Sequence, residues 1–70
     1  MNQTQVIPIQ QFRDDVVARM VDAAGMQEEV ALWLADMEVH RIVSGFHKNT
    51  TPGDLAIELA RDGEARKALA

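Results

Sequence analysis

Asp36, His40 and His47 are the side chains in this sequence best suited to hold a metal ion. Asp36 and His40 are four residues apart, so on a helix both project from one face, as two ligands of one ion must. His47 lies about 10.5 Å further along a helix axis than His40, which is too far to share that ion. We therefore expect an exposed Asp–His pair and no metal site. Replacing both histidines by alanine should leave metal content and any activity unchanged.

Nucleophilic and acid–base chemistry have weaker support. Ser44 follows His40 by four residues and could meet it on a helix, but no oxyanion-stabilising donor or enclosing cleft is indicated. We interpret Ser44 as a small residue at a helix contact. The adjacent acids at 14–15 and at 28–29 fall where helices are predicted to start, so the helix dipole accounts for them. The four glycines are scattered and form no phosphate-binding loop. We expect no enzymatic activity, cofactor or small-molecule substrate.

The composition is that of a folded globular domain, with 47% hydrophobic and 26% charged residues. The absence of cysteine excludes disulfides and cysteine-based zinc sites. No apolar run is long enough to span a bilayer and the N-terminus has no secretion pattern, so we expect a cytoplasmic protein away from membranes. A chain of 70 residues buries only about 60% of its unfolded surface. A partner or a second copy would supplement so small a core.

The charge distribution disfavours nucleic acid. The net charge is −4, and residues 14–38 hold seven acids against one base, Arg19. Affinity for DNA or RNA comes largely from lysine and arginine contacts to phosphates. The concentrated basic residues are His40, Arg41, His47 and Lys48. This small basic corner on an acidic chain predicts no nucleic-acid partner.

The N-terminal third is predicted to be an extended arm followed by a helix. Residues 1–11 are assigned to the arm because Val6, Ile7 and Ile9 are β-branched and Pro8 disfavours a helical Ile7. Residues 12–24 have helical spacing, and Gly25 ends this helix. Its apolar half contains Phe12, Val16, Val17, Met20, Val21, Ala23 and Ala24.

Residues 26–46 are predicted to form one long central helix with apolar side chains on two sides. The first stripe holds Val30, Trp33, Leu34 and Met37. The second stripe holds Leu32, Ala35, Val39, Ile42, Val43 and Phe46. The water-facing line between them holds Glu29, Asp36, His40 and His47, and Glu38 stands alone in the opposite gap. A helix that is apolar on two sides must be covered twice.

A third helix is predicted over residues 52–70. Thr51 is its N-cap, Pro52 its first residue, and Asp54 takes the place of the capping-box glutamate. Its large apolar residues are few and Gly63 could interrupt it. The chain is therefore predicted to be one all-α, three-helix bundle-like domain spanning 1–70. Its central helix would lie between the first helix and either the third helix or a second subunit.

The second stripe exceeds what the third helix can cover, so we predict a homodimer through it. The predicted interface comprises Leu32, Val39, Ile42, Val43 and Phe46, with a two-fold axis near Val39 and Ile42. An alternative partner patch comprises Trp33, Met37, Arg41 and Lys48. Trp33 is the only tryptophan, and we expect it in the core rather than in a partner-binding hot spot.

The order of arm, helix, Gly25 and helix is superficially similar to that of the ribbon-helix-helix DNA-binding dimers, with residues 16–25 as the first helix and turn. Pro8 cannot donate in a ribbon, no basic residue precedes Arg13, and the second helix lacks a Ser or Thr start, so we do not assign the chain to that family. The predicted function is a non-enzymatic protein–protein interaction module. It would be a regulatory or inhibitory accessory protein of the phage or mobile-element kind, acting as a homodimer. The alternative is a dimeric DNA-binding transcriptional regulator.

Overall fold

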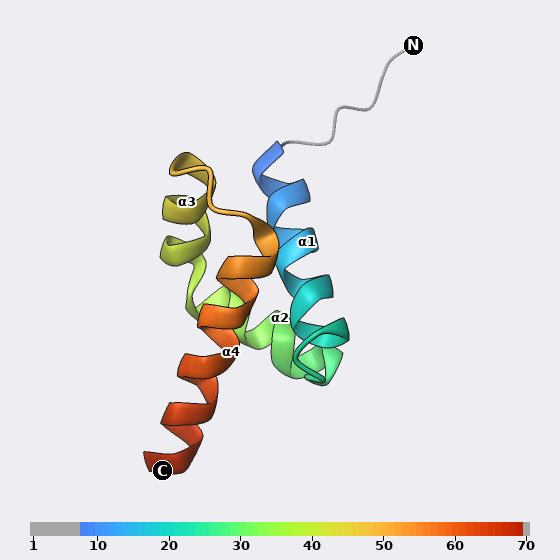
Figure 1. Cartoon of the computed structure of the whole chain (residues 1–70), viewed down its shortest axis with the longest axis vertical. Helices are drawn as coiled ribbons and strands as arrows, with labels where there is room; N and C mark the ends of the chain where they lie inside the picture. The colour runs from blue at the N-terminus through green and yellow to red at the C-terminus, as the bar shows by residue number, and fades with distance from the viewer. Residues whose placement is uncertain (1–7, 70) are drawn as a thin grey trace.

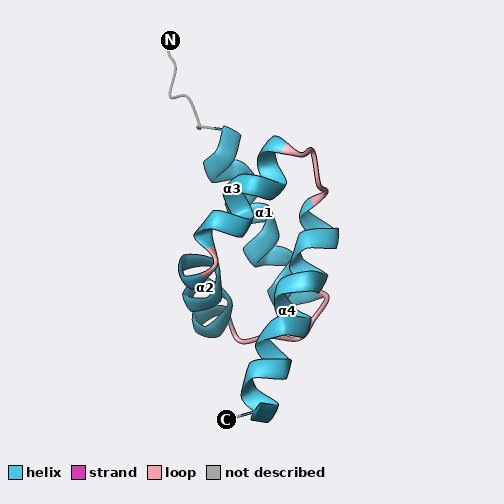
Figure 2. Cartoon of the chain, turned by 90° about the vertical axis from the view of Figure 1, so that its left-hand side faces the viewer, coloured by secondary structure: helices cyan, strands magenta, loops and turns pink. Residues whose placement is uncertain are grey.

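The computed structural model describes the backbone of residues 8–69 and the side chains of residues 8–63. These residues form four helices and no strand: α1 (Pro8–Asp22), α2 (Glu28–Met37), α3 (Val39–His47) and α4 (Pro52–Leu69). The all-α prediction is confirmed. The arrangement differs from the predicted one, because α1 packs against each of the other three helices and is the central element (Figures 1 and 2).

The predicted extended arm is wrong over residues 8–11, which form the first turn of α1. Proline is well suited to this place, since its fixed φ is helical and a first helical residue needs no N–H donor. Residues 1–7, the rest of the predicted arm, lie outside the described residues. At its other end α1 stops at Asp22, two residues before the predicted end, and Gly25 follows with a φ of 70°.

The predicted single helix over residues 26–46 is also wrong, because the chain bends at Glu38. Its φ of −109° and ψ of 32° leave the helical region, although its N–H still donates to the carbonyl of Leu34. The next helical bonds run from Arg41 and Ile42 back to the carbonyl of Glu38. An unbroken helix of this length would be about 30 Å long and would run past the small core. The bend directs α3 back over α1 and α4.

One continuous face of α2 and α3 remains buried through the bend. It comprises Ala31, Leu34, Ala35, Glu38, Ile42 and Gly45. This face lies between the two predicted stripes. It includes Leu34 from the first stripe and Ala35 and Ile42 from the second, while the other stripe residues lie outside it. The gap assigned to Glu38 is thus the centre of the buried face, whereas the line of Glu29, Asp36, His40 and His47 is exposed as predicted.

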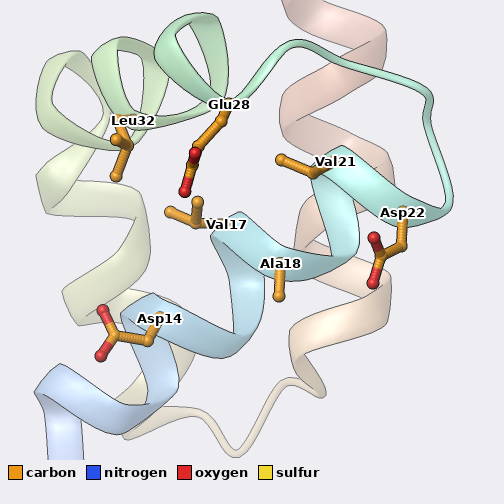
Figure 3. A pocket seen from close by; sticks show the side chains of 7 residues that line it. All are labelled: Asp14, Val17, Ala18, Val21, Asp22, Glu28 and Leu32. Carbon is orange, nitrogen blue, oxygen red and sulfur yellow. The ribbon is translucent and has the colours of Figure 1, made fainter.

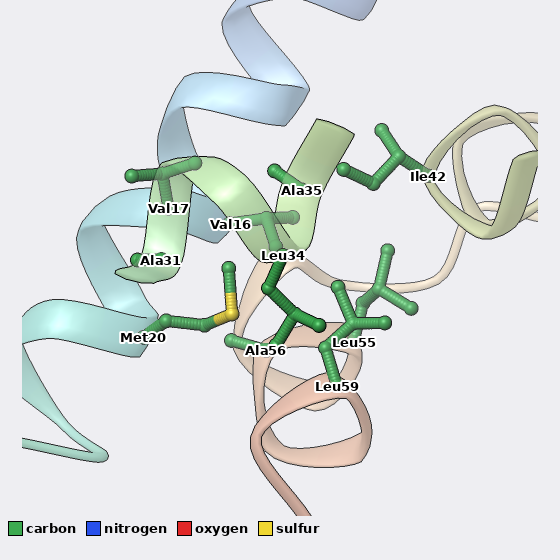
Figure 4. Close-up of a cluster of buried hydrophobic side chains, with 10 residues drawn as sticks. All are labelled: Val16, Val17, Met20, Ala31, Leu34, Ala35, Ile42, Leu55, Ala56 and Leu59. Atoms are coloured by element: carbon green, nitrogen blue, oxygen red, sulfur yellow. The ribbon is translucent and has the colours of Figure 1, made fainter. Parts of the chain in front are cut away.

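The core combines this face with side chains from α1 and α4 (Figure 4). Its buried members are Val16, Val17, Met20, Ala31, Leu34, Ala35, Ile42, Leu55, Ala56 and Leu59. Small residues on α4 let the helices approach closely: a Cβ atom on Gly63 would lie 3.3 Å from Leu34 Cδ2. The predicted interruption at Gly63 does not occur, because α4 continues to Leu69.

The end of α3 and the start of α4 are stabilised by local backbone and side-chain features. Asn49 has a φ of 61°, the left-handed conformation that asparagine tolerates after a helix. The Oγ1 of Thr51 accepts a hydrogen bond of 3.2 Å from the N–H of Asp54, which confirms Thr51 as the N-cap of α4. Among the described residues, no helix combines the length and the apolar character needed to cross a membrane.

Candidate interaction surfaces

Large apolar side chains are exposed on both sides of the buried face of α2 and α3. The first group, which we name the Trp33 flank, comprises Val30, Trp33 and Met37, exposed by 44, 56 and 53%. The second group, the Val39 flank, comprises Leu32, Val39 and Val43, exposed by 39, 52 and 37%. These six side chains have less cover than apolar groups of their size usually find in a folded protein.

The expectation that Trp33 lies in the core is wrong. Leu34 is the residue of the first stripe that enters the core, where it is 3% exposed and packs close to Gly63 of α4. Because Leu34 packs against α4 at Gly63, its neighbour Trp33 lies at the exposed edge of the buried face of α2. The spacing of Val30, Trp33 and Met37 is three and then four residues, as in the seam of a helix pair.

The predicted dimer interface is only partly at the surface. Ile42 is 1% exposed and belongs to the core of its own chain, so it is removed from that interface. Phe46 is half-buried, with its ring centroid 5.7 Å from that of Phe12 in an edge-to-face arrangement. Its inner side is thus covered by α1. Leu32, Val39 and Val43 remain exposed.

Arg41 connects α3 to α4 and to the bend. It donates to Asp62 and, over 3.3 Å, to Glu58, and its Nη1 lies 3.8 Å from the Oε1 of the buried Glu38. Hydrogen bonding to Asp62 raises the pKa of Arg41 above its ordinary value, against the opposing effect of burial. The guanidinium therefore stays charged throughout the working pH range, and its contribution to stability persists there. Arg41 of the alternative partner patch is thus occupied within the fold.

The predicted Asp36–His40 pair does not form. Asp36 instead accepts a hydrogen bond of 2.8 Å from Arg13 of α1, and His40 Nε2 lies 4.0 Å from Glu38 Oε1. Within the part of the chain that the structure describes, no three His, Cys, Asp or Glu side chains come together as metal ligands would. Sequence spacing on one helix could not identify a partner on another.

A groove of about 380 Å³ between α3 and α4 brings together several residues of the predicted basic corner. It is lined by His40, Arg41, Ser44, Gly45, Lys48, Thr50, Leu55 and Glu58. Ser44 is exposed, and its neighbour Gly45 makes the close helix contact that we assigned to Ser44. Lys48 is exposed at the end of α3, while Arg41 is held by acids on α4. The corner therefore retains little free positive charge.

A second groove, of about 460 Å³, runs between α1 and α2 (Figure 3). Its lining is Asp14, Val17, Ala18, Val21, Asp22, Glu28 and Leu32. Asp14 and Asp22 lie toward opposite ends of the α1 wall, and the Glu28 carboxylate points into the middle of the groove, next to Val17 and Leu32. This groove was not predicted from the sequence, because its two walls belong to different helices. The helical spacing of Asp14, Ala18 and Asp22 on one side of α1 was the available indication.

Comparison with known proteins finds no matching family model, no significantly similar curated protein and no matching solved structure.

Proposed function

We propose that this protein is a non-enzymatic protein–protein interaction module that acts as a homodimer, with a regulatory or inhibitory role toward another protein. The observation that carries the proposal is the Trp33 flank, where one tryptophan, one methionine and one valine are each about half exposed on adjacent turns of α2. Tryptophan dominates many interfaces and methionine adapts to the shape of a partner.

A second copy of the chain is the occupant that this flank fits best. If two α2 helices pack antiparallel about a two-fold axis at Trp33, Val30 of one copy lies opposite Met37 of the other. The two tryptophans then meet at the axis, as a self-complementary patch requires. The shape of the Trp33 flank thus favours self-association.

The Trp33 flank is preferred over the interface expected from the sequence for a physical reason. On the Val39 flank, Ile42 is buried in its own core and Phe46 is half-covered by α1. On the Trp33 flank, all three large side chains remain available. Half burial of one such side chain contributes about 1 kcal/mol to association. The three side chains on each of two copies together must offset the entropy lost on association, so the dimer is expected to be weak and reversible.

Two aspartate substitutions test the proposal and serve as matched controls for each other. Met37 and Val39 are 53 and 52% exposed on opposite flanks, so neither substitution should disturb the monomer. Analytical ultracentrifugation from about 10 µM to about 1 mM, a range suited to a weak dimer, should show dimers for the wild type and for Val39→Asp. Met37→Asp should sediment as a monomer. A monomeric wild type would refute the homodimer, and dissociation by Val39→Asp alone would move the axis to the other flank.

The alternative, a dimeric DNA-binding regulator, has less support. Its predicted ribbon includes residues 8–11, which are helical, and Arg41 of its basic corner is paired with acids. If DNA binding is nevertheless observed, its affinity should fall steeply with salt, because phosphate contacts release counterions.

A further inference from the structure

We propose that the groove between α1 and α2 binds a basic amphipathic helix of the regulated protein. This inference rests on the proposed function, since it names the class of partner that the interaction module takes. Glu28 and Leu32 are the residues of α2 that line the groove, and none of the Trp33 flank residues is part of its lining. Dimerisation and partner binding would therefore use separate surfaces.

The apolar part of the groove is suited to the apolar face of a helix. Leu32 of α2 is 39% exposed and lies across the groove from Val17 of α1, while Val21 lines the groove further along α1, beyond Glu28 (Figure 3). Ala18 of α1 is exposed at the edge of the groove with its side chain pointing away from α2, and its small size leaves that edge open (Figure 3). Leucine-sized side chains on an incoming helix would complete the cover of this strip, as they do in helix-in-groove recognition.

The charge of the lining selects the sign of the partner. Asp14, Asp22 and Glu28 are the charged residues of the lining, and none of the lining residues is basic. Arg13, the nearest base by sequence, makes its short contact to Asp36, 2.8 Å away, and lies 3.9 Å from Asp14. Asp22 and Glu28 form no ion pair with any other described residue. A partner with lysine or arginine beside its apolar face would be complementary.

The position of Asp22 at the C-terminal end of α1 is unfavourable for a carboxylate in the folded chain. Asp22 is the last residue of α1, and an acid there interacts unfavourably with the negative end of the helix dipole. Glu28 lines the same groove and adds a further negative charge to it. A cationic group bound near Asp22 would offset the unfavourable dipole interaction. This is an independent physical reason to expect a basic ligand.

The spacing of the acids gives the spacing of the partner's bases. Asp14 and Asp22 are eight residues apart on α1, which corresponds to about 12 Å along the helix. A helix lying along the groove would therefore carry two basic residues seven or eight positions apart, with apolar residues between them on the same side. The proposed ligand is thus a helix of basic–apolar–basic pattern.

A synthetic peptide provides the probe. A fluorescein-labelled helix of leucines and lysines, with flanking lysines eight positions apart, would be titrated with the full chain and followed by fluorescence anisotropy. A peptide of the same composition with its leucines spread around the helix is the control. We expect the patterned peptide to bind at least about ten-fold more tightly, and its affinity to fall with salt as exposed ion pairs are screened.

Adjacent glutamates on α2 supply a matched pair of variants. Glu28 and Glu29 both lie in the first turn of α2, so each Gln substitution removes the same dipole interaction, but only Glu28 lines the groove. Glu28→Gln should weaken peptide binding about two- to five-fold, while Glu29→Gln should leave it nearly unchanged. Ala18→Arg, at an exposed helical position that tolerates arginine, should fill the groove and reduce binding by at least about ten-fold.

The outcomes separate this inference from the proposed dimer. Groove variants that lose the peptide but still sediment as dimers support it, as does a Met37→Asp monomer that keeps the peptide. Equal effects of Glu28→Gln and Glu29→Gln, or equal binding of the control peptide, would show that the peptide is attracted by the net charge of the protein and not by the groove. Either result would overturn the proposed groove site. Loss of dimers in Ala18→Arg would mean that a second copy occupies the groove, which also overturns it.

Discussion

Gly45 is the residue on which the contact between α3 and the rest of the fold depends most directly. It is buried, and a Cβ atom there would lie 3.1 Å from Leu55 Cδ2, 3.6 Å from Thr50 Cβ and 3.7 Å from Phe12 Cζ. The contacts to Thr50 and Phe12 are at ordinary van der Waals distance, but the Leu55 methyl group would have to shift by a few tenths of an ångström. The sequence analysis assigned Gly45 to a helix end, but α3 continues past it to His47.

Gly45→Ala should therefore destabilise the protein even though alanine favours helices. Overpacking at a well-packed site costs about 1–3 kcal/mol, and the helical gain of alanine over glycine is about 1 kcal/mol. We expect the free energy of unfolding to fall by about 1 kcal/mol in urea denaturation. Gly53→Ala is the control, since an added Cβ at Gly53 has no neighbour within 4 Å. It should raise that free energy, and a gain at both positions would contradict the packing argument.

Thr51 offers a second test at the scale of single residues. Its Oγ1 accepts the hydrogen bond from the N–H of Asp54 at the start of α4. Thr51→Ala should lower the free energy of unfolding by about 1 kcal/mol, whereas Thr51→Ser keeps the acceptor and should cost much less. Thermal denaturation followed by circular dichroism would measure both. Equal losses would show that the hydroxyl group is not what Thr51 contributes.

At the scale of helices, the sequence predicted which segments are helical better than it predicted where a helix is interrupted. The caps at Thr51 and Pro52 and the water-facing line with Asp36 and His40 were readable, because they depend on neighbours along one helix. The bend at Glu38 was not, since neither glycine nor proline marks it. It depends on contacts with other helices, and a lone glutamate in an otherwise apolar sector was the available indication. The interaction surfaces shared this difficulty, because they are formed between helices.

The ion pairs of Arg41 join the bend at Glu38 to α4. Arg41→Met should lower the free energy of unfolding by about 1–3 kcal/mol, because it leaves the buried Glu38 carboxylate without this guanidinium. The expected loss is no larger because the Arg41 side chain is 28% exposed and its partners Glu58 and Asp62 are half exposed, so water screens these ion pairs. Urea denaturation would measure the loss.

Two further variants test whether burial of the Glu38 carboxylate causes the loss of stability in Arg41→Met. Adding Glu38→Gln to Arg41→Met should restore part of the loss, since the double variant buries no carboxylate there. Arg13→Met removes a pair in which Asp36 is 72% exposed and should cost less than about 1 kcal/mol. A loss at Arg13 as large as that at Arg41 would contradict the distinction between the two pairs.

At the scale of the whole molecule, burial of one face of α2 and α3 leaves exposed apolar residues on both sides of it. Contacts of α1 and α4 with Ala31, Leu34, Ala35 and Ile42 use the available core residues of a 70-residue chain. The flanks beyond them remain uncovered, and Leu32 of the Val39 flank also lines the acidic α1–α2 groove. A chain of this size has a limited core of its own, so a partner that covers the exposed flanks would add substantially to its stability.

Trp33 allows self-association to be followed without any label, because it is the only tryptophan and is 56% exposed. If two copies pair about Trp33, its indole ring moves from water into an apolar contact on dimerisation. The fluorescence emission maximum should then shift to shorter wavelength as the protein concentration rises, and should return on dilution. Met37→Asp should hold the emission at the long-wavelength position at every concentration, while Val39→Asp should behave as the wild type. An emission maximum that stays constant while sedimentation reports dimers would mean that the copies meet away from Trp33, and the pairing of α2 helices would be wrong.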